Sequence, residues 1–155
     1  MSYARKRVVL DTSTLISAAI NPQSPSGIAY QLAVELCDVF VSSETTAELV
    51  EVIRREKLRR YFARDEGFRE RFVLDYQGLA IDAPITIVAD DCADPKDTKF
   101  LSLALSVLAD FIVSGDKKHL IPMHPYFGVA IVGSQDFVAA ISVPATRKHP
   151  RSPEV

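Results

Sequence analysis

The hydrophobic positions of this 155-residue sequence alternate between short continuous runs and longer stretches with helical spacing. The short runs are rich in β-branched residues, as buried strands are, and lie at 7–11, 38–42, 85–88, 111–113 and 129–132. We expect helices at 24–36, from 42 or 43 to 53, at 65–80, at 100–108 and at 134–140. This alternation predicts a three-layer α/β/α sandwich around a central, mostly parallel five-stranded sheet.

The length suits one domain, and we expect it to span residues 1–142. Residues 143–155 contain three prolines and several basic residues without an apolar period, so a disordered C-terminal tail is expected there. No uncharged apolar stretch approaches the length of a signal peptide core or a membrane span. The sequence therefore predicts a cytoplasmic protein without a membrane partner.

Lysines and arginines total 18 and acidic residues total 20, for a formal net charge of −2 and an isoelectric point near 5.9. Binding to nucleic acid would therefore depend on a local basic patch. The densest one contains the following residues: Arg54, Arg55, Lys57, Arg59 and Arg60. With Lys117 they are candidates for contact with RNA phosphates. The alternative is an ordinary solvated helix face, with Tyr61 and Phe62 as core residues.

Acidic residues follow the predicted strands at the edge where parallel sheets bind ligands. Asp11 and Asp116 each come after a strand, and Glu48 lies on the helix after the second strand. Asp94 and Asp97 lie near the start of the buried helix, so we expect all five side chains to converge on one cleft. Taken singly, each has a simpler interpretation as a turn, helix-capping or solvated residue.

Carboxylates gathered in one cleft need compensating positive charge. Two of them about 6 Å apart repel by roughly 3 kcal/mol at an effective dielectric constant near 20. All-oxygen sites of this kind suit Mg²⁺ or Mn²⁺. One or two such ions can activate water and stabilise the transition state of phosphodiester cleavage.

Four segments in this order resemble the motifs of PIN domains, over about residues 7 to 140. They are VLDTSTLIS at 9–17, SETTAEL at 43–49, DPKDTKFLSLA at 94–104 and DFIVSGDKKHL at 110–120. The Asp-Pro-Lys-Asp form of the third motif is similar to a bacterial subgroup of toxin components from toxin–antitoxin pairs, the VapC-like ribonucleases.

The resemblance implies a metal-dependent endoribonuclease that cleaves single-stranded RNA, with a protein antitoxin and a homodimer as possible partners. It also implies roles for individual residues. The catalytic, metal-binding acids are Asp11, Glu48, Asp97 and Asp116, with Asp94 as a fifth metal ligand. Ser114 matches a supporting hydroxyl, whereas Ser13 stands where the family commonly has asparagine.

Two other functions remain open at this stage. A catalytically silent PIN-like binding module would keep the fold without the chemistry. A phosphatase of the aspartyl-phosphate type would use Asp11 as nucleophile, but it usually has a second acid at the position of Ser13. His119 follows Asp116 closely and could help to hold phosphate, although a charged turn is the simpler interpretation.

Overall fold

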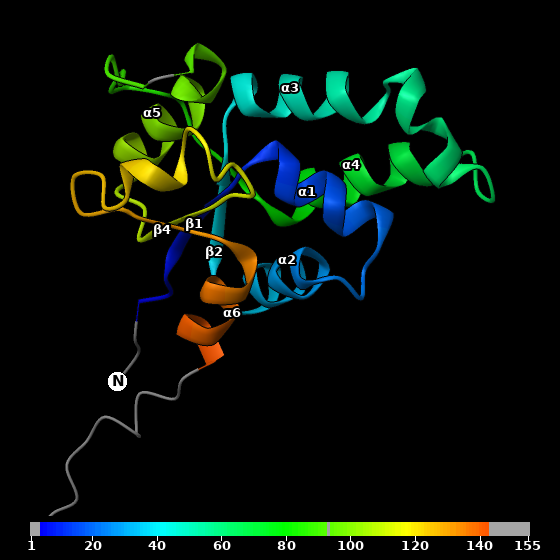
Figure 1. The fold of residues 1–155 in the computed structure, drawn as a ribbon, viewed down its shortest axis with the longest axis horizontal. Helices are drawn as coiled ribbons and strands as arrows, with labels where there is room; N and C mark the ends of the chain where they lie inside the picture. Colours follow the sequence, from blue (N-terminus) through cyan, green and yellow to red (C-terminus); the bar gives the residue numbers. More distant parts are fainter. Residues whose placement is uncertain (1–3, 93, 143–155) are drawn as a thin grey trace, which may run out of the picture.

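The computed structural model describes residues 4–92 and 94–142, which form a parallel sheet between two layers of helices. The strands are β1 (Arg7–Leu10), β2 (Asp38–Val41), β3 (Ile81–Asp82), β4 (Phe111–Val113) and β5 (Ala130–Val132). Their order is β3-β2-β1-β4-β5, and every neighbouring pair is parallel. The predicted three-layer fold with five strands is confirmed (Figure 1).

Alternate residues of β1 and β2 pack against opposite layers. Val8 and Leu10 of β1 face one hydrophobic cluster, whereas Val9 between them faces the other. The first layer contains α1 (Thr12–Ile20), α2 (Pro25–Leu36), α3 (Ser43–Ile53), α4 (Phe68–Leu79) and α6 (Ser134–Ser142). The opposite layer is built around α5 (Thr98–Val107), which Figure 1 shows across the sheet from α1 and α2.

Short 3₁₀ turns connect some of these elements. Three such turns occur in the described residues: η1 (Glu56–Phe62), η2 (Pro95–Asp97) and η3 (Ile121–Met123). The first follows α3 and contains much of the basic patch, and the second leads directly into α5. Figure 1 shows α3 and α4 side by side, joined at their outer end through η1. This pair of helices forms an arm beyond the sheet.

The predicted third strand at 85–88 is wrong. The strand that pairs with the outer side of β2 is β3, where Ile81 and Asp82 lie opposite Phe40 and Val41. Farther along, the backbone N–H groups of Thr86 and Ile87 both donate to the hydroxyl of Ser106 on α5, each at 2.9 Å. This side-chain acceptor takes the place of a neighbouring strand, so a β-branched run forms a loop.

The helix α1 was not among the predicted elements. A single residue, Asp11, separates it from β1, and this residue is its N-cap. The other helices and four of the strands lie within a few residues of their expected limits. The predicted tail at 143–155 lies outside the described residues. Across residues 4–92 and 94–142, no helix combines the length and apolar character needed to cross a membrane.

Candidate metal-binding active site

Asp11 is fixed at the carboxyl end of β1, where the strand passes directly into α1. Its side chain is only 4% exposed. Oδ1 accepts hydrogen bonds from the Thr14 backbone N–H at 2.9 Å and from the Ser13 hydroxyl at 2.7 Å, while Oδ2 accepts one from the Ser114 hydroxyl. Asp11 is therefore both a helix cap and a buried carboxylate at the sheet edge.

Asp116 lies beside it, two residues after the fully buried Ser114 at the end of β4. The backbone N–H of Asp116 donates to the Ser114 hydroxyl oxygen at 2.9 Å. Its Oδ1 in turn accepts from the backbone N–H groups of Lys118 at 3.1 Å and His119 at 2.9 Å. The tight turn after β4 thus holds the second carboxylate beside the first.

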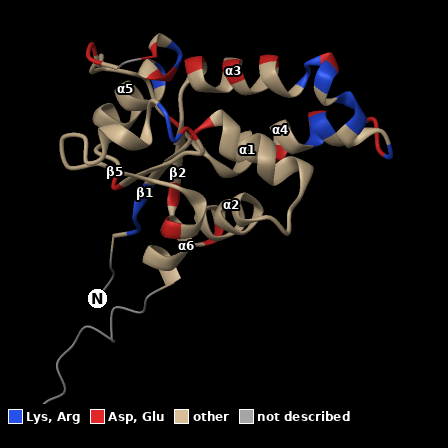
Figure 2. Ribbon diagram, viewed as in Figure 1, with Lys and Arg blue, Asp and Glu red and all other residues tan. Residues whose placement is uncertain are grey.

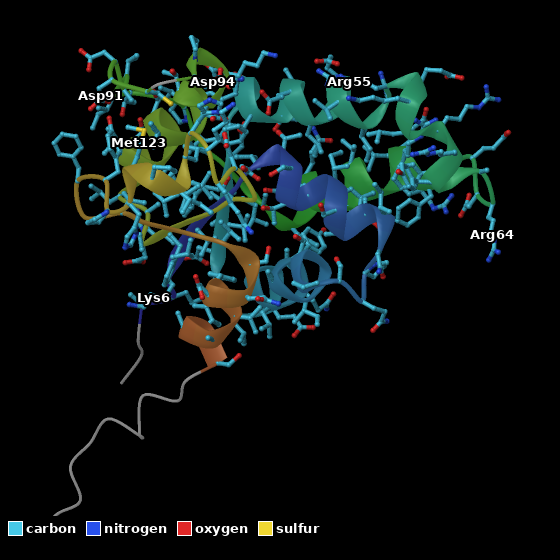
Figure 3. The ribbon with its side chains drawn as sticks, in the orientation of Figure 1. Lys6, Arg55, Arg64, Asp91, Asp94 and Met123 are labelled. Atoms are coloured by element: carbon cyan, nitrogen blue, oxygen red, sulfur yellow. The ribbon has the colours of Figure 1, made fainter. Side chains whose placement is uncertain are left out.

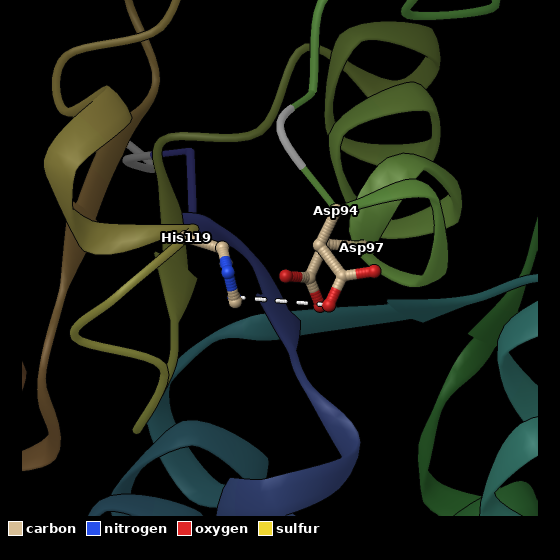
Figure 4. A group of neighbouring side chains, drawn as sticks. All are labelled: Asp94, Asp97 and His119. Atoms are coloured by element: carbon tan, nitrogen blue, oxygen red, sulfur yellow. Dashed lines mark ion pairs between the residues drawn. The ribbon is translucent and has the colours of Figure 1, made fainter.

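The third part of the site comes from η2, on the opposite layer. Asp94 caps this turn through the Lys96 backbone N–H at 3.0 Å, and Asp97 ends it. His119 approaches from the β4 side, with its Nδ1 3.7 Å from Asp94 Oδ2 (Figure 4). The same nitrogen lies 3.5 Å from Asp116 Oδ2. One ligand atom each of Asp94, Asp97 and His119 lies within 4.8 Å of the others.

The carboxylates of this cluster shift one another's protonation. Burial, together with the neighbouring charges of Asp116, Asp94 and Asp11, raises the pKa of Asp97 to about 8. Burial also raises the pKa of Asp11, although its hydrogen bonds act against this. For Asp116, burial acts upward, but the hydrogen bond with a protonated Asp97 and the N–H groups of the following turn keep the pKa below its ordinary value.

Glu48 lies on α3 at the other side of the same cleft, and both of its oxygens already have partners. Oε2 accepts from the Thr12 hydroxyl, and Oε1 lies 2.6 Å from the ammonium of Lys99. Glu48 and Lys99 are 22% and 25% exposed. Among the described residues, Glu48 is therefore the one acid of the cleft that is paired with a lysine ammonium.

All five predicted acids line a single cleft of about 610 Å³. Of the predicted RNA-binding residues, Arg55 and Lys57 line it as well. Arg54 faces a separate groove between α3 and α4, and Arg60 borders another cavity at the outer end of the arm. Arg59 forms an exposed ion pair at 3.3 Å with the adjacent Glu56. The structure thus brings the acids together but divides the basic patch.

Figure 2 shows this division, with lysine and arginine gathered at the outer end of α3 and in the segment that follows it. In Figure 3, Arg64 lies at the outer tip of this arm, whereas Asp94 lies near its inner end. Lys117 lines a neighbouring cavity, together with Ser114 and the first residues of α6. The cleft is therefore acidic at its inner end and basic farther along the arm.

Two site residues were not singled out from the sequence, and a third, His119, was considered there only as a phosphate contact. Thr12 and Lys99 both contact Glu48, and His119 faces Asp94 and Asp116. Lys99 follows Asp97 by two residues, so its position in the third motif was a usable signal. His119 lies in the turn that carries Asp116, but its approach to Asp94 depends on the distance between two layers.

The donor set fits a hard divalent cation. Oδ2 of Asp97 is buried, and no hydrogen-bond donor among the described residues reaches it. A buried carboxylate oxygen without a partner is costly unless a cation or proton compensates. Carboxylate oxygens with one nearby imidazole suit Mn²⁺, and the oxygens alone suit Mg²⁺. The arrangement can therefore hold an ion at the sheet edge.

The sequence profile of the PIN domain family matches residues 7–118, which contain all five acids. The chain belongs to the PIN domain family. Among solved structures, the fold is similar to a chain in the crystal structure of VapBC2 from Rickettsia felis bound to a DNA fragment from their promoter. The TM-score is 0.51 at 13% identity, covering 81% of this chain and 96% of that one. No curated protein sequence gives a significant match.

Proposed function

We propose that this PIN domain protein is a metal-dependent endoribonuclease that cleaves phosphodiester bonds in single-stranded RNA. The observation that carries the proposal is the convergence of Asp11, Asp94, Asp97 and Asp116, with the buried Asp97 Oδ2 left without a donor. Such a cluster is unfavourable without a cation. Its place at the carboxyl edge of a parallel sheet is where ligands bind in folds of this kind.

The four aspartates would hold Mg²⁺ or Mn²⁺, which supplies Lewis acidity toward a phosphoryl oxygen and lowers the pKa of water. The chain itself keeps the ligands in place. Ser13 and Ser114 orient the Asp11 carboxylate through hydrogen bonds, and the backbone N–H of His119 orients that of Asp116. Supporting hydrogen bonds of this kind raise metal affinity because they reduce the freedom of the ligands.

RNA would reach the acids along the arm. Arg55 and Lys57 line the same cleft as the aspartates, so a phosphate backbone entering from the arm meets positive charge first. Arg55 forms an ion pair with Glu51 at 2.7 Å, whereas Lys57 is an exposed residue of η1 without an ion pair among the described residues. We therefore assign backbone contact to these two residues of the basic patch, with Lys57 as the more available cation.

We also propose that the protein is the toxin of a toxin–antitoxin pair and acts in the cytoplasm, where its RNA substrate is found. The resembling structure is a VapBC2 complex, and its similarity in fold supports a protein antitoxin as partner here. A homodimer, which would deepen the cleft, belongs to the same proposal.

The geometry does not favour the phosphatase alternative. Enzymes of that type usually have a second acid two residues after the nucleophile, and here that residue is Ser13. Ser13 uses its hydroxyl on Asp11 and supplies no second acid. A silent binding module would share the fold and cluster, and only an activity measurement distinguishes it.

The test is cleavage of labelled single-stranded RNA and DNA by the purified protein with Mn²⁺, Mg²⁺ or EDTA. We expect RNA cleavage that requires metal and falls by about a hundredfold or more in Asp97→Asn. The matched control is Asp75→Asn, which removes an exposed carboxylate on α4 away from the cleft. A folded protein that cleaves no RNA with either metal would favour the silent module.

A further inference from the structure

The acids of the cleft divide into two groups with different partners. Asp97 keeps a buried oxygen without a donor, whereas each oxygen of Glu48 has a donor of its own. Thr12 reaches Glu48 from the start of α1, and Lys99 reaches it from the first turn of α5. The ammonium of Lys99 neutralises the charge of Glu48, so this carboxylate does not need a cation, whereas the donors that hold Asp11 carry no charge.

Lys99 is itself firmly held. Its ammonium donates to Glu48 Oε1 at 2.6 Å and to the backbone carbonyl of Lys96 at 2.9 Å. The side chain is 25% exposed, and the ammonium lies 5.8 Å from the centre of the Phe100 ring. A lysine ammonium is usually solvated, at the end of a flexible aliphatic side chain. Here Glu48 and Lys96 occupy two of its three N–H donors, and the third has no acceptor among the described residues.

We propose that Lys99 takes the place of a second divalent cation, so that this site binds a single ion on its aspartate side. Two-metal nucleases hold ions roughly 4 Å apart, each on its own carboxylates. A second ion here would need Glu48 as a ligand. The ammonium of Lys99 already lies 2.6 Å from Oε1 of Glu48 and occupies the place of that ion. The third N–H of Lys99 would be available to a phosphodiester bound against Glu48, and its fixed single charge would then act beside one metal ion.

This inference rests on the divalent-cation site proposed above, and its test counts ions. Mn²⁺ binding is measured by calorimetry and by electron paramagnetic resonance of the free ion, on the folded full chain without RNA. We expect one ion per chain in the wild type and two in Lys99→Met. Lys99→Arg retains the charge and should stay at one. Lys96→Met removes an exposed lysine from the same cleft and should also stay at one.

A second variant tests the role of Glu48 independently of Lys99. If Glu48 serves the ammonium, Glu48→Gln weakens binding of the single ion far less than Asp97→Asn does. Two ions in the wild type, one ion in Lys99→Met, or equal losses in the two acid variants would each overturn the inference. If the wild type binds no Mn²⁺ at all, the proposed metal site itself fails, which is a distinguishable result.

Discussion

The hydroxyl of Ser114 donates a hydrogen bond to Oδ2 of Asp11, joining the ends of the two central strands. The preceding residues, Leu10 and Val113, are direct partners in the parallel register of β1 and β4. Register pairing therefore places the serine and the aspartate side by side without any loop rearrangement. The backbone N–H of Asp116 extends this chain of hydrogen bonds to the next carboxylate.

Ser114→Ala should weaken Mn²⁺ binding by about 10- to 100-fold, because Asp11 loses a donor that orients it and Asp116 loses the acceptor for its N–H. The same change should lower the free energy of unfolding by about 1–3 kcal/mol, since it leaves buried polar groups unpaired. Calorimetric titration and urea unfolding measure the two effects. Ser43→Ala, at an exposed hydroxyl on α3, is the control. Unchanged metal affinity in Ser114→Ala would contradict the assigned role.

The stability of the metal-free protein should fall as the pH rises from about 4 to about 8. The pKa of Asp97 is raised from 3.8 to about 8 in the folded state, so the folded protein binds more protons than the unfolded chain between these values. Stability therefore decreases with pH across this window. Asp11, with a raised pKa, contributes in the same direction. Thermal unfolding in EDTA across this range is the measurement.

Asp97→Asn should flatten this pH dependence, because the variant has no proton to lose at that position. Asp116 acts in the opposite sense, since its lowered pKa adds stability that is lost only as the pH falls below its ordinary range. A wild-type slope as flat as that of the variant would show that Asp97 titrates normally.

Metal binding should become tighter with pH over the same range. An ion on Asp97 must displace the proton held there, so the apparent Mn²⁺ affinity should rise by up to about tenfold per pH unit below the pKa of about 8. Titrations at pH 6, 7 and 8 give the slope. Affinity independent of pH would place the ion away from Asp97.

Removing charge from the arm should weaken RNA binding only where the charge faces the cleft. In an Asp97→Asn background, Lys57→Ala should lower RNA affinity and reduce the slope of log K against log salt by about 0.7, the value for one phosphate contact on a single strand. Fluorescence anisotropy at several salt concentrations provides both quantities. Arg59→Ala is the matched control, because its charge pairs with Glu56 outside the cleft. Equal effects would mean that the whole patch binds RNA nonspecifically.

Tyr76 offers a test of the core that is independent of the site. Tyr76 belongs to α4, and its buried hydroxyl has no hydrogen-bond partner among the described residues. Tyr76→Phe should therefore raise the free energy of unfolding by about 1 kcal/mol. Tyr126→Phe should lower it by a similar amount, since that hydroxyl donates to Asp91 at 2.6 Å. Destabilisation of both variants in urea would show that Tyr76 has a partner in solution.

The hydrophobic pattern of the sequence was sufficient to predict the strands that are buried on both faces. The strands β2, β1 and β4 are short apolar runs that are buried on both faces. Such strands are typical of a parallel sheet between two layers of helices. The run at 85–88 has the same composition but became a loop, because Ser106 on α5 supplies the acceptor for its N–H groups. Ser106 lies about twenty residues after this run, so the pattern of the run itself does not indicate the contact.

The sequence by itself determined the fold class and the gathering of the acids. Carboxylates that follow parallel strands or begin neighbouring helices must share one edge, so Asp11 and Asp116 could be placed together from order alone. Only the tertiary structure decided which acid is paired with a lysine and which one keeps a buried oxygen without a donor. Glu48 and Lys99 are 51 residues apart and His119 meets Asp94 across two layers. Pairing, burial and protonation depend on distances between side chains, and those are set when the layers pack.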